Sequence, residues 1–258
     1  MIRRTVLLAG LILFAVSGIV IGTILYLRTI PAPAKTETSG ETAALSAGSY
    51  SEHTGSYDIA ANYPTTTPLL ASVGAAENDS AIALMRNFVG GTVSTFKAGF
   101  TSNTYGAGTP AQPSDGKGSL QIVYLIGSSA HTVSYIFTIY EDTGGAHPFS
   151  YFKTFAFDTK TGAALSLADI FLPGASYLDR LSSISRSELP GIIGPGADTQ
   201  FIQNGTTPEE KNFENFFFDN SDFVILFPTY QVAPYALGPQ TLRIKTETLS
   251  DILKPEYR

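Results

Sequence analysis

The chain has 258 residues, a net charge of −6 from 16 Lys and Arg against 22 Asp and Glu, and no cysteine. The absence of cysteine excludes disulfides, thiol catalysis and thiolate metal sites. The acidic balance argues against nucleic acid and anionic lipid headgroups as partners.

The N-terminal segment predicts a membrane anchor. Residues 5–27 contain no Asp, Glu, Lys, Arg or His, and about 20 apolar residues are enough to cross the hydrocarbon core. Arg3 and Arg4 precede this stretch, so the excess of positive charge on the cytoplasmic side places the rest of the chain outside. The alternative is a cleaved signal peptide, but apolar regions of signal peptides usually span only about 7–15 residues. We therefore expect a cytoplasmic stub (residues 1–4) and a single transmembrane helix (residues 5–27) in the cytoplasmic membrane.

Residues 28–49 are dominated by Pro, Ala, Thr, Ser and Gly and are typical of a flexible tether. Beyond Arg3, Arg4 and Arg28, 13 basic residues remain against 22 acidic ones, so the exported part would attract a cationic partner. The remaining length suits one large domain, or two small regions that share a core.

The first exported elements are a strand and a helix. Residues 56–63 alternate apolar and polar side chains before Pro64, which predicts a strand. A helix capped by Asn78 or Asp79 is predicted next, and the pair Gly90-Gly91 inside it indicates a kink or a close approach to a sheet. Its apolar stripe comprises Ile82, Met85, Val89, Val93, Phe96 and Phe100.

The rest of the chain predicts mainly strands. After a loop at residues 103–118, three apolar runs separated by turn residues predict an antiparallel meander. A helix ended by Pro190, a loop, an aromatic hairpin and a short last strand follow. The fold class is therefore α+β, an antiparallel sheet with two main helices packed on it. The ranges are 120–126, 133–140 and 151–157 for the meander, 175–189 for the helix, 191–207 for the loop, 212–218 and 223–227 for the hairpin, and 242–245 for the last strand.

Two segments carry a family resemblance. The first is Gly144-Gly145-Ala146-His147-Pro148 with the following runs at residues 155–162 and 165–171, and the second is the Phe-Pro-x-Tyr-x-Val-Ala-Pro-Tyr-Ala-x-Gly run at residues 227–238. Together they resemble the RsiV-like extracytoplasmic domain family. Residues 119–258 would be the family's C-terminal region. Residues 50–118 look like the companion region that precedes it, and the two would share one core.

The resemblance implies a domain found outside the membrane in a lysozyme-sensing anti-sigma factor, and attached to polysaccharide deacetylase domains in cell-wall enzymes. This chain departs from both. Residues 1–4 are too few to hold a sigma factor, and no paired Asp with a His-x-x-x-His-like metal set is present. We therefore expect no metal and no cofactor.

The candidate ligand-binding residues lie in the two Gly- and Pro-rich segments, which are typical of functional loops. His147 could titrate near neutral pH in a cleft, or its ring could fix a turn by bonding a neighbouring carbonyl. Tyr230 and Tyr235 could be exposed aromatic anchors, or their hydroxyls could pin the loop to the sheet. The full set is Gly144, Gly145, His147, Tyr230 and Tyr235.

No catalytic residue is predicted, because no Ser lies in a Gly-x-Ser-x-Gly elbow and no spacing links His53, His131 and His147 into a metal site. We expect a non-enzymatic binding or accessory domain of the bacterial cell envelope. It would recognise a protein, such as a cationic lysozyme-like one, or a cell-wall glycan. The alternatives are a wall-polysaccharide hydrolase or deacetylase, and a purely structural envelope domain.

Overall fold

The computed structural model describes residues 47–67, 73–101, 117–145 and 147–258. The predicted stub and transmembrane helix, most of the tether and nearly all of the predicted loop at 103–118 lie outside these residues. Ala44–Arg258 forms one compact unit. Within the described ranges, no helix has both the length and the apolar character needed to cross a bilayer.

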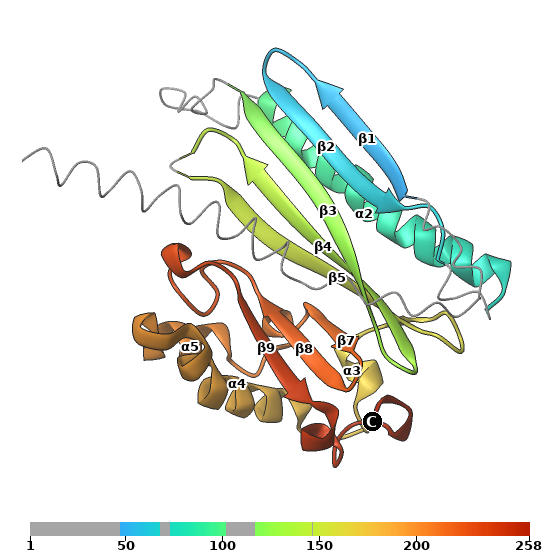
Figure 1. The fold of residues 1–258 in the computed structure, drawn as a ribbon, viewed down its shortest axis with the longest axis vertical. Helices are drawn as coiled ribbons and strands as arrows, with labels where there is room; N and C mark the ends of the chain where they lie inside the picture. Colours follow the sequence, from blue (N-terminus) through green and yellow to red (C-terminus); the bar gives the residue numbers. More distant parts are fainter. Residues whose placement is uncertain (1–46, 68–72, 102–116, 146) are drawn as a thin grey trace, which may run out of the picture. The chain divides into compact units, whose positions relative to one another are not determined.

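The N-terminal lobe, residues 47–165, is a six-stranded sheet with one long helix packed on one face (Figure 1). Strands follow one another in chain order across the sheet, and all pairs are antiparallel except β2 and β3. The elements are β1 (Ala47–His53), β2 (Tyr57–Pro64), α2 (Ala75–Thr101), β3 (Gly118–Ser128), β4 (Thr132–Asp142), β5 (Phe149–Asp158) and β6 (Ala164–Leu165).

Side-chain alternation explains this packing. On β3, Leu120 and Ile122 are buried whereas Val123 and Leu125, on the opposite face, are 42% and 58% exposed. Successive side chains of a strand point to opposite faces, so only one face of β3 meets the helix. The apolar stripe of α2, which includes Met85 and Phe96, packs with this face in one cluster.

The C-terminal lobe, residues 167–258, contains a three-stranded antiparallel sheet in the order β7-β8-β9 with helices beside it (Figure 1). Its core is rich in phenylalanine, and Leu181 and Leu189 of α4 pack in the same cluster as Phe223 and Phe227 of β8. The elements are α3 (Leu167–Ile170), α4 (Tyr177–Ile193), α5 (Thr199–Gly205), β7 (Phe216–Asp219), β8 (Asp222–Phe227) and β9 (Gln240–Lys245).

Backbone and side-chain hydrogen bonds join the lobes at the hairpin between β3 and β4 and along β5. The amide of Asn220 donates to the carbonyl of Ser128 at 2.8 Å, and the hydroxyl of Thr154 donates to the carbonyl of Glu214 at 3.3 Å. Near the C-terminus, the hydroxyl of Tyr257 donates to the carboxylate of Asp158 at 3.0 Å. The lobes therefore share polar contacts, and the apolar cluster of the C-terminal lobe also includes Ala156 of β5.

The α+β class, the meander and the aromatic hairpin are confirmed. The expectation of a single antiparallel sheet is wrong, because the strands form two sheets and β2 pairs parallel to β3. Strand β1, which no sequence pattern predicted, forms the edge of the larger sheet.

Two helix predictions also need correction. Pro190 lies inside α4, which continues to Ile193, and Gly194, at φ 75°, ends it by donating its amide to the Pro190 carbonyl. The predicted loop at residues 191–207 contains α5, which Asp198 caps by accepting from the amides of Gln200 and Phe201.

The two glycines of α2 do not mark a close approach to the sheet. A Cβ atom built at Gly90 or Gly91 would meet no heavy atom within 4 Å. The helix runs through both glycines as one element, from Ala75 to Thr101. It begins before Asn78 and Asp79, which were predicted to cap it.

Candidate functional site

The structure brings His147, Tyr230 and Tyr235 together from two segments far apart in the sequence. The rings of His147 and Tyr235 stack with their centroids 4.0 Å apart. The hydroxyl of Tyr230 lies 2.8 Å from Nε2 of His147, and the two tyrosine rings are 5.5 Å apart. These residues form what we call the Tyr230 cluster.

Hydrogen bonding fixes the roles of the atoms in the Tyr230 cluster. Nδ1 of His147 lies 3.0 Å from the carbonyl oxygen of Pro148, which can only accept, so Nδ1 carries the proton. In the neutral ring Nε2 then accepts from the Tyr230 hydroxyl. The Tyr235 hydroxyl also donates to the Pro148 carbonyl, at 2.9 Å. The structural roles considered for His147 and Tyr235, fixing a turn and pinning a loop, are therefore both present.

The loop that carries the two tyrosines is held firmly by its neighbours. The hydroxyl of Thr229 donates to the Ser150 carbonyl of β5 at 3.1 Å. The side-chain amide of Gln231 donates to the carbonyls of Gly205 and Asn212, each at 2.9 Å. Gly205 must be glycine, because a Cβ atom there would lie 1.9 Å from the Gln231 carbonyl oxygen. Tyr230 is thus presented by a loop fixed on both sides.

The two predicted glycines shape the turn between β4 and β5. Gly144 has φ 82°, a conformation that favours glycine, and its amide donates to Oδ1 of Asp142 at 2.9 Å. Gly145 is exposed, and a Cβ atom there would meet only the His147 carbonyl oxygen, at 3.9 Å. Gly144 therefore sets the backbone of the turn, whereas Gly145 leaves the surface beside His147 uncrowded.

Tyr230 combines exposure with an unfavourable backbone. Its φ is 70°, which is rare for a bulky residue, and its side chain remains 47% exposed. Such a conformation costs of order 1–3 kcal/mol and persists where the surroundings impose it, often at functional sites. Exposed aromatic residues also occur on the neighbouring strands, with Tyr140 37% and Phe149 45% exposed.

Acidic groups accompany this aromatic surface. The pKa of the Tyr140 hydroxyl is raised, first by burial and then by the nearby Asp142 and Tyr235. Glu141, the preceding residue of β4, points to the opposite face of the sheet and lines a cavity beside α2. The surface around the Tyr230 cluster therefore combines tyrosine rings with the carboxylate of Asp142.

The other two histidines lie elsewhere. Nδ1 of His53 contacts Asp58 at 3.1 Å in the β1–β2 hairpin, and His131 lies in the β3–β4 turn. Among the residues that the structure describes, no group of three His, Asp or Glu side chains is arranged to hold a metal ion.

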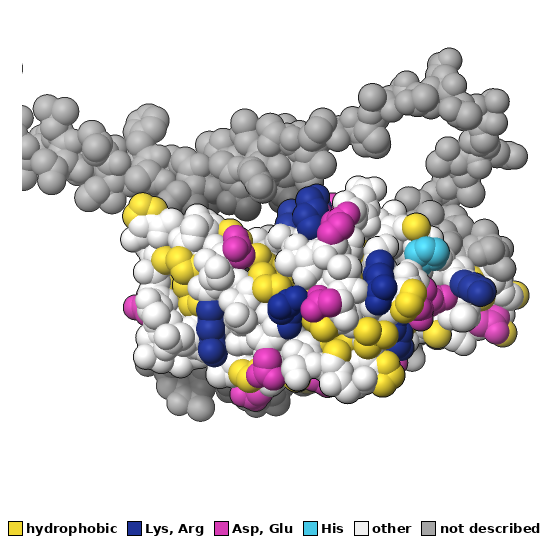
Figure 2. Space-filling view, turned by 90° about the horizontal axis from the view of Figure 1, so that it is seen from below, with side chains coloured by type: hydrophobic (Ala, Val, Ile, Leu, Met, Phe, Trp, Pro, Cys, Tyr) yellow, Lys and Arg dark blue, Asp and Glu magenta, His cyan; other side chains and the backbone are white. Residues whose placement is uncertain are grey.

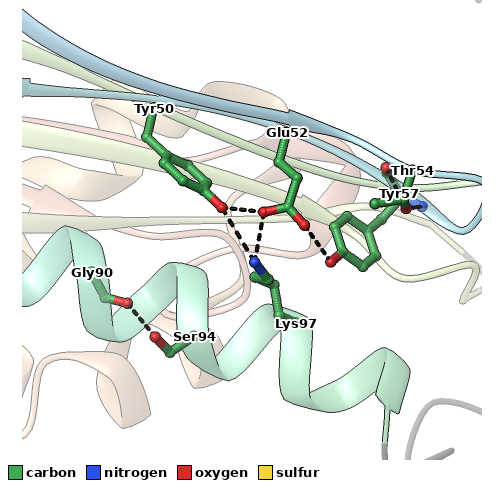
Figure 3. A network of polar contacts seen from close by, with 7 residues as sticks. All are labelled: Tyr50, Glu52, Thr54, Tyr57, Gly90, Ser94 and Lys97. Carbon is green, nitrogen blue, oxygen red and sulfur yellow. Dashed lines mark hydrogen bonds and ion pairs between the residues drawn. The ribbon is translucent and has the colours of Figure 1, made fainter.

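The sequence analysis missed a groove along α2. It has a volume of about 590 Å³ and is lined by α2 together with Tyr50 of β1 and Tyr63 of β2. Beside it, the carboxylate of Glu52 contacts Nζ of Lys97 at 2.6 Å and accepts hydrogen bonds from the Tyr50 and Tyr57 hydroxyls (Figure 3). These bonds, Lys97 first, lower the pKa of Glu52 from 4.5 to about 2. The sequence analysis noted Gly90, which lines this groove, but interpreted it as a kink or a close approach to the sheet.

Charge is mixed on the face of the described residues seen in Figure 2, where Lys and Arg side chains are interspersed with Asp and Glu. The surface ion pairs of the described residues include Arg180 with Asp251 at 3.0 Å and Lys211 with Glu209 at 2.7 Å. Exposed pairs of this kind contribute little to stability.

Comparison with known proteins identifies part of the chain. Residues 168–247 match the family model described as a protein of unknown function (DUF3298). This match falls within the C-terminal lobe. A solved DUF3298-family structure from Bacteroides fragilis covers 83% of this chain and 95% of its own, at 17% identity and a TM-score of 0.51, so the two share a fold.

Two curated proteins are similar in sequence. The peptidoglycan-N-acetylmuramic acid deacetylase PdaC of Bacillus subtilis is 38% identical over 133 residues, which are 52% of this chain and 28% of that protein. The esterase Rv3036c of Mycobacterium tuberculosis is 27% identical over 107 residues, 42% of this chain and 46% of the esterase. The chain thus spans less than half the length of either relative.

Proposed function

We propose that this chain is a membrane-anchored, non-enzymatic binding domain on the outer face of the bacterial cytoplasmic membrane. It recognises a cationic, lysozyme-like protein through the Tyr230 cluster and the aromatic residues beside it. The observation that carries the proposal is Tyr230 itself, an exposed ring held at φ 70° with its hydroxyl on His147. A rigid aromatic side chain presented in this way is typical of an interface anchor.

Charge supports a cationic partner. Next to Tyr230 and Tyr235, the surface presents the exposed ring of Tyr140 with the carboxylate of Asp142 nearby. Tyrosine, tryptophan and arginine dominate the binding energy of protein interfaces, and complementary charge speeds association. The acidic balance of the whole chain acts in the same direction.

The relatives support a role at the cell wall. PdaC is named as a peptidoglycan deacetylase, and the match covers only 28% of it, which suits an accessory region beside a catalytic one. The second candidate is an enzyme, because both curated relatives carry enzyme names, a deacetylase and an esterase. A wall glycan in place of a protein is the remaining alternative for the ligand.

The test is a binding titration of the purified full-length chain with a lysozyme. Tyr230→Ala should weaken binding about tenfold or more, as for an aromatic anchor. Its thermal unfolding should shift little, since the side chain is largely exposed. Ile192→Ala, which truncates a 45% exposed side chain on α4, serves as the control and should bind as the wild type does.

Tyr235→Phe separates anchoring from scaffolding. It removes the hydroxyl that donates to Pro148 and keeps the ring that stacks on His147. We expect a loss of about 1 kcal/mol in the free energy of unfolding and a smaller loss of binding than for Tyr230→Ala. Equal affinity of Tyr230→Ala and wild type would overturn the proposed surface.

Two further results would redirect the proposal. Binding of soluble peptidoglycan fragments without binding of lysozyme would favour the glycan, and turnover of an acetylated glycan or an ester would favour the enzyme. The location is tested by an alkaline phosphatase fused to the C-terminus, which should be active in a bacterial host.

A further inference from the structure

The groove along α2 has the chemistry of a binding site. Tyr50 and Tyr63 form its strand side, whereas Arg86, Gly90, Ser94 and Lys97 lie on its helix side. Its volume of about 590 Å³ falls within the range of small-molecule sites. It uses none of the residues of the Tyr230 cluster.

Gly90 has no structural reason to be glycine. Inside a helix glycine costs about 1 kcal/mol relative to alanine. The backbone of α2 is helical at this position, and a Cβ atom built there would meet no heavy atom within 4 Å. The missing side chain leaves the middle of the groove open. The Gly90 carbonyl accepts a hydrogen bond from the Ser94 hydroxyl at 2.8 Å (Figure 3).

Two basic side chains stand over the two tyrosine rings. The guanidinium of Arg86 lies 5.6 Å from the Tyr63 ring centroid, and Nζ of Lys97 lies 5.9 Å from that of Tyr50. The two residues are about three helical turns apart, a span of about 16 Å along the helix axis. The groove therefore has a basic side chain near each end and is long enough for an extended ligand.

The two ends differ in charge. At one end, Glu52 contacts Lys97 at 2.6 Å and offsets its charge. At the other, Arg86 is exposed and, within the described part of the chain, has no carboxylate within 4 Å. The groove thus carries a net positive charge at the Arg86 end, although the chain as a whole is acidic.

We infer that this groove binds a segment of an anionic glycan. The Arg86 guanidinium presents a planar fork that suits a carboxylate or a phosphate on the polymer. Tyrosine rings offer apolar surface to sugar rings. The open space over Gly90 accommodates the body of the chain.

The experiment titrates the full-length chain with three soluble probes: an oligogalacturonate, which carries carboxylates, a poly(glycerol phosphate) oligomer, and a neutral chitin oligosaccharide. We expect one or both anionic probes to bind at least about tenfold more tightly than the neutral one, and added salt to weaken this binding. The comparison between the two anionic probes identifies the acidic group.

Filling the groove provides a variant that should still fold. Gly90→Gln places a side chain in open space on a helix and should abolish binding without lowering the melting temperature. Gly91→Gln is the matched control, because its Cβ also meets nothing within 4 Å but Gly91 lines a different cavity, beside Asn87 and Tyr151. This control should bind as the wild type does.

Charge variants test recognition directly. Arg86→Gln should weaken binding of the anionic probes about tenfold or more. Glu52→Gln removes a negative charge from the groove, so the anionic probes should bind more tightly. Tyr230→Ala should leave glycan affinity unchanged, so failure here and failure of the proposed protein-binding surface can be told apart. Equal binding of the neutral probe, no binding of either anionic probe, or wild-type binding by Gly90→Gln would each overturn the inference.

Discussion

The two lobes differ in whether their sequence matches a known family and in whether cavities lie on their surface. In the C-terminal lobe, phenylalanines fill the space between a small sheet and its helices, and the match to the DUF3298 model falls on this lobe. In the N-terminal lobe a single helix covers one face of a larger sheet, and cavities lie along that helix. Both lobes have aromatic cores, but the family model matches only the C-terminal lobe, whereas the two cavities lie in the N-terminal lobe.

The largest expected effect tests whether the lobes unfold as one. Phe223→Ala removes a fully buried ring that contacts the rings of Phe171, Phe216 and Phe218, and Phe96→Ala removes the corresponding ring of the N-terminal lobe. Each should lower the free energy of unfolding by about 3–5 kcal/mol. Urea unfolding, followed by circular dichroism and by tyrosine fluorescence, measures both.

The pattern of transitions decides the comparison. Because hydrogen bonds link the lobes through Ser128, Thr154 and Asp158, we expect a single transition that both variants shift equally. Two transitions, with each variant moving only one of them, would show that the lobes are independent units. Leu84→Ala, on an exposed position of α2, should leave the midpoint nearly unchanged.

A smaller effect is expected at the contact between the C-terminus and β5. The Tyr257 side chain is 8% exposed, and its hydroxyl donates to Asp158 at 3.0 Å. Tyr257→Phe keeps the ring and removes this bond, so the free energy of unfolding should fall by about 1.5 kcal/mol. Tyr177→Phe, which removes a bond to Glu210 within the C-terminal lobe, is the matched control and should cost less, because its partner is exposed. An equal loss of unfolding free energy in both variants would mean that the contact between the lobes stabilises the fold no more than an exposed hydrogen bond does.

Local sequence patterns correctly predicted the elements that depend on residues close together in the chain. The apolar run at residues 133–140 predicted β4, and the aromatic runs at residues 212–218 and 223–227 predicted the β7–β8 hairpin. The three residues of the Tyr230 cluster were also selected by their Gly- and Pro-rich surroundings, and they meet in space. Whether they bind a ligand remains a prediction.

The features that were missed depend on distant parts of the chain. The first three residues of β1, Ala47–Ser49, were assigned to the tether, and the segment forms a strand because it pairs with β2. Pro190 lies near enough to the end of α4 for the helix to continue past it to the glycine cap at 194. The α2 groove is formed by β1, β2 and the helix together, so no local pattern predicted it.

The last prediction concerns Glu52, which links the edge strand to α2 in the N-terminal lobe. Hydrogen bonds from Lys97, then Tyr50 and Tyr57, hold its folded pKa at about 2 against an ordinary 4.5. A carboxyl whose pKa is lower in the folded state stabilises the fold above its unfolded pKa, and this contribution is lost as the pH falls through the folded value. Glu52→Gln should therefore be less stable than wild type at neutral pH, with the difference shrinking from about pH 4.5 downward and vanishing near about pH 2. In the C-terminal lobe, the pKa of Glu209 is lowered by Lys211 and Thr207, neighbours in the sequence, so Glu209→Gln should give a smaller change of the same sign. Urea unfolding of the three proteins across this range measures both differences, and a Glu52→Gln deficit that stays constant down to the lowest pH would refute the electrostatic link between β1 and α2.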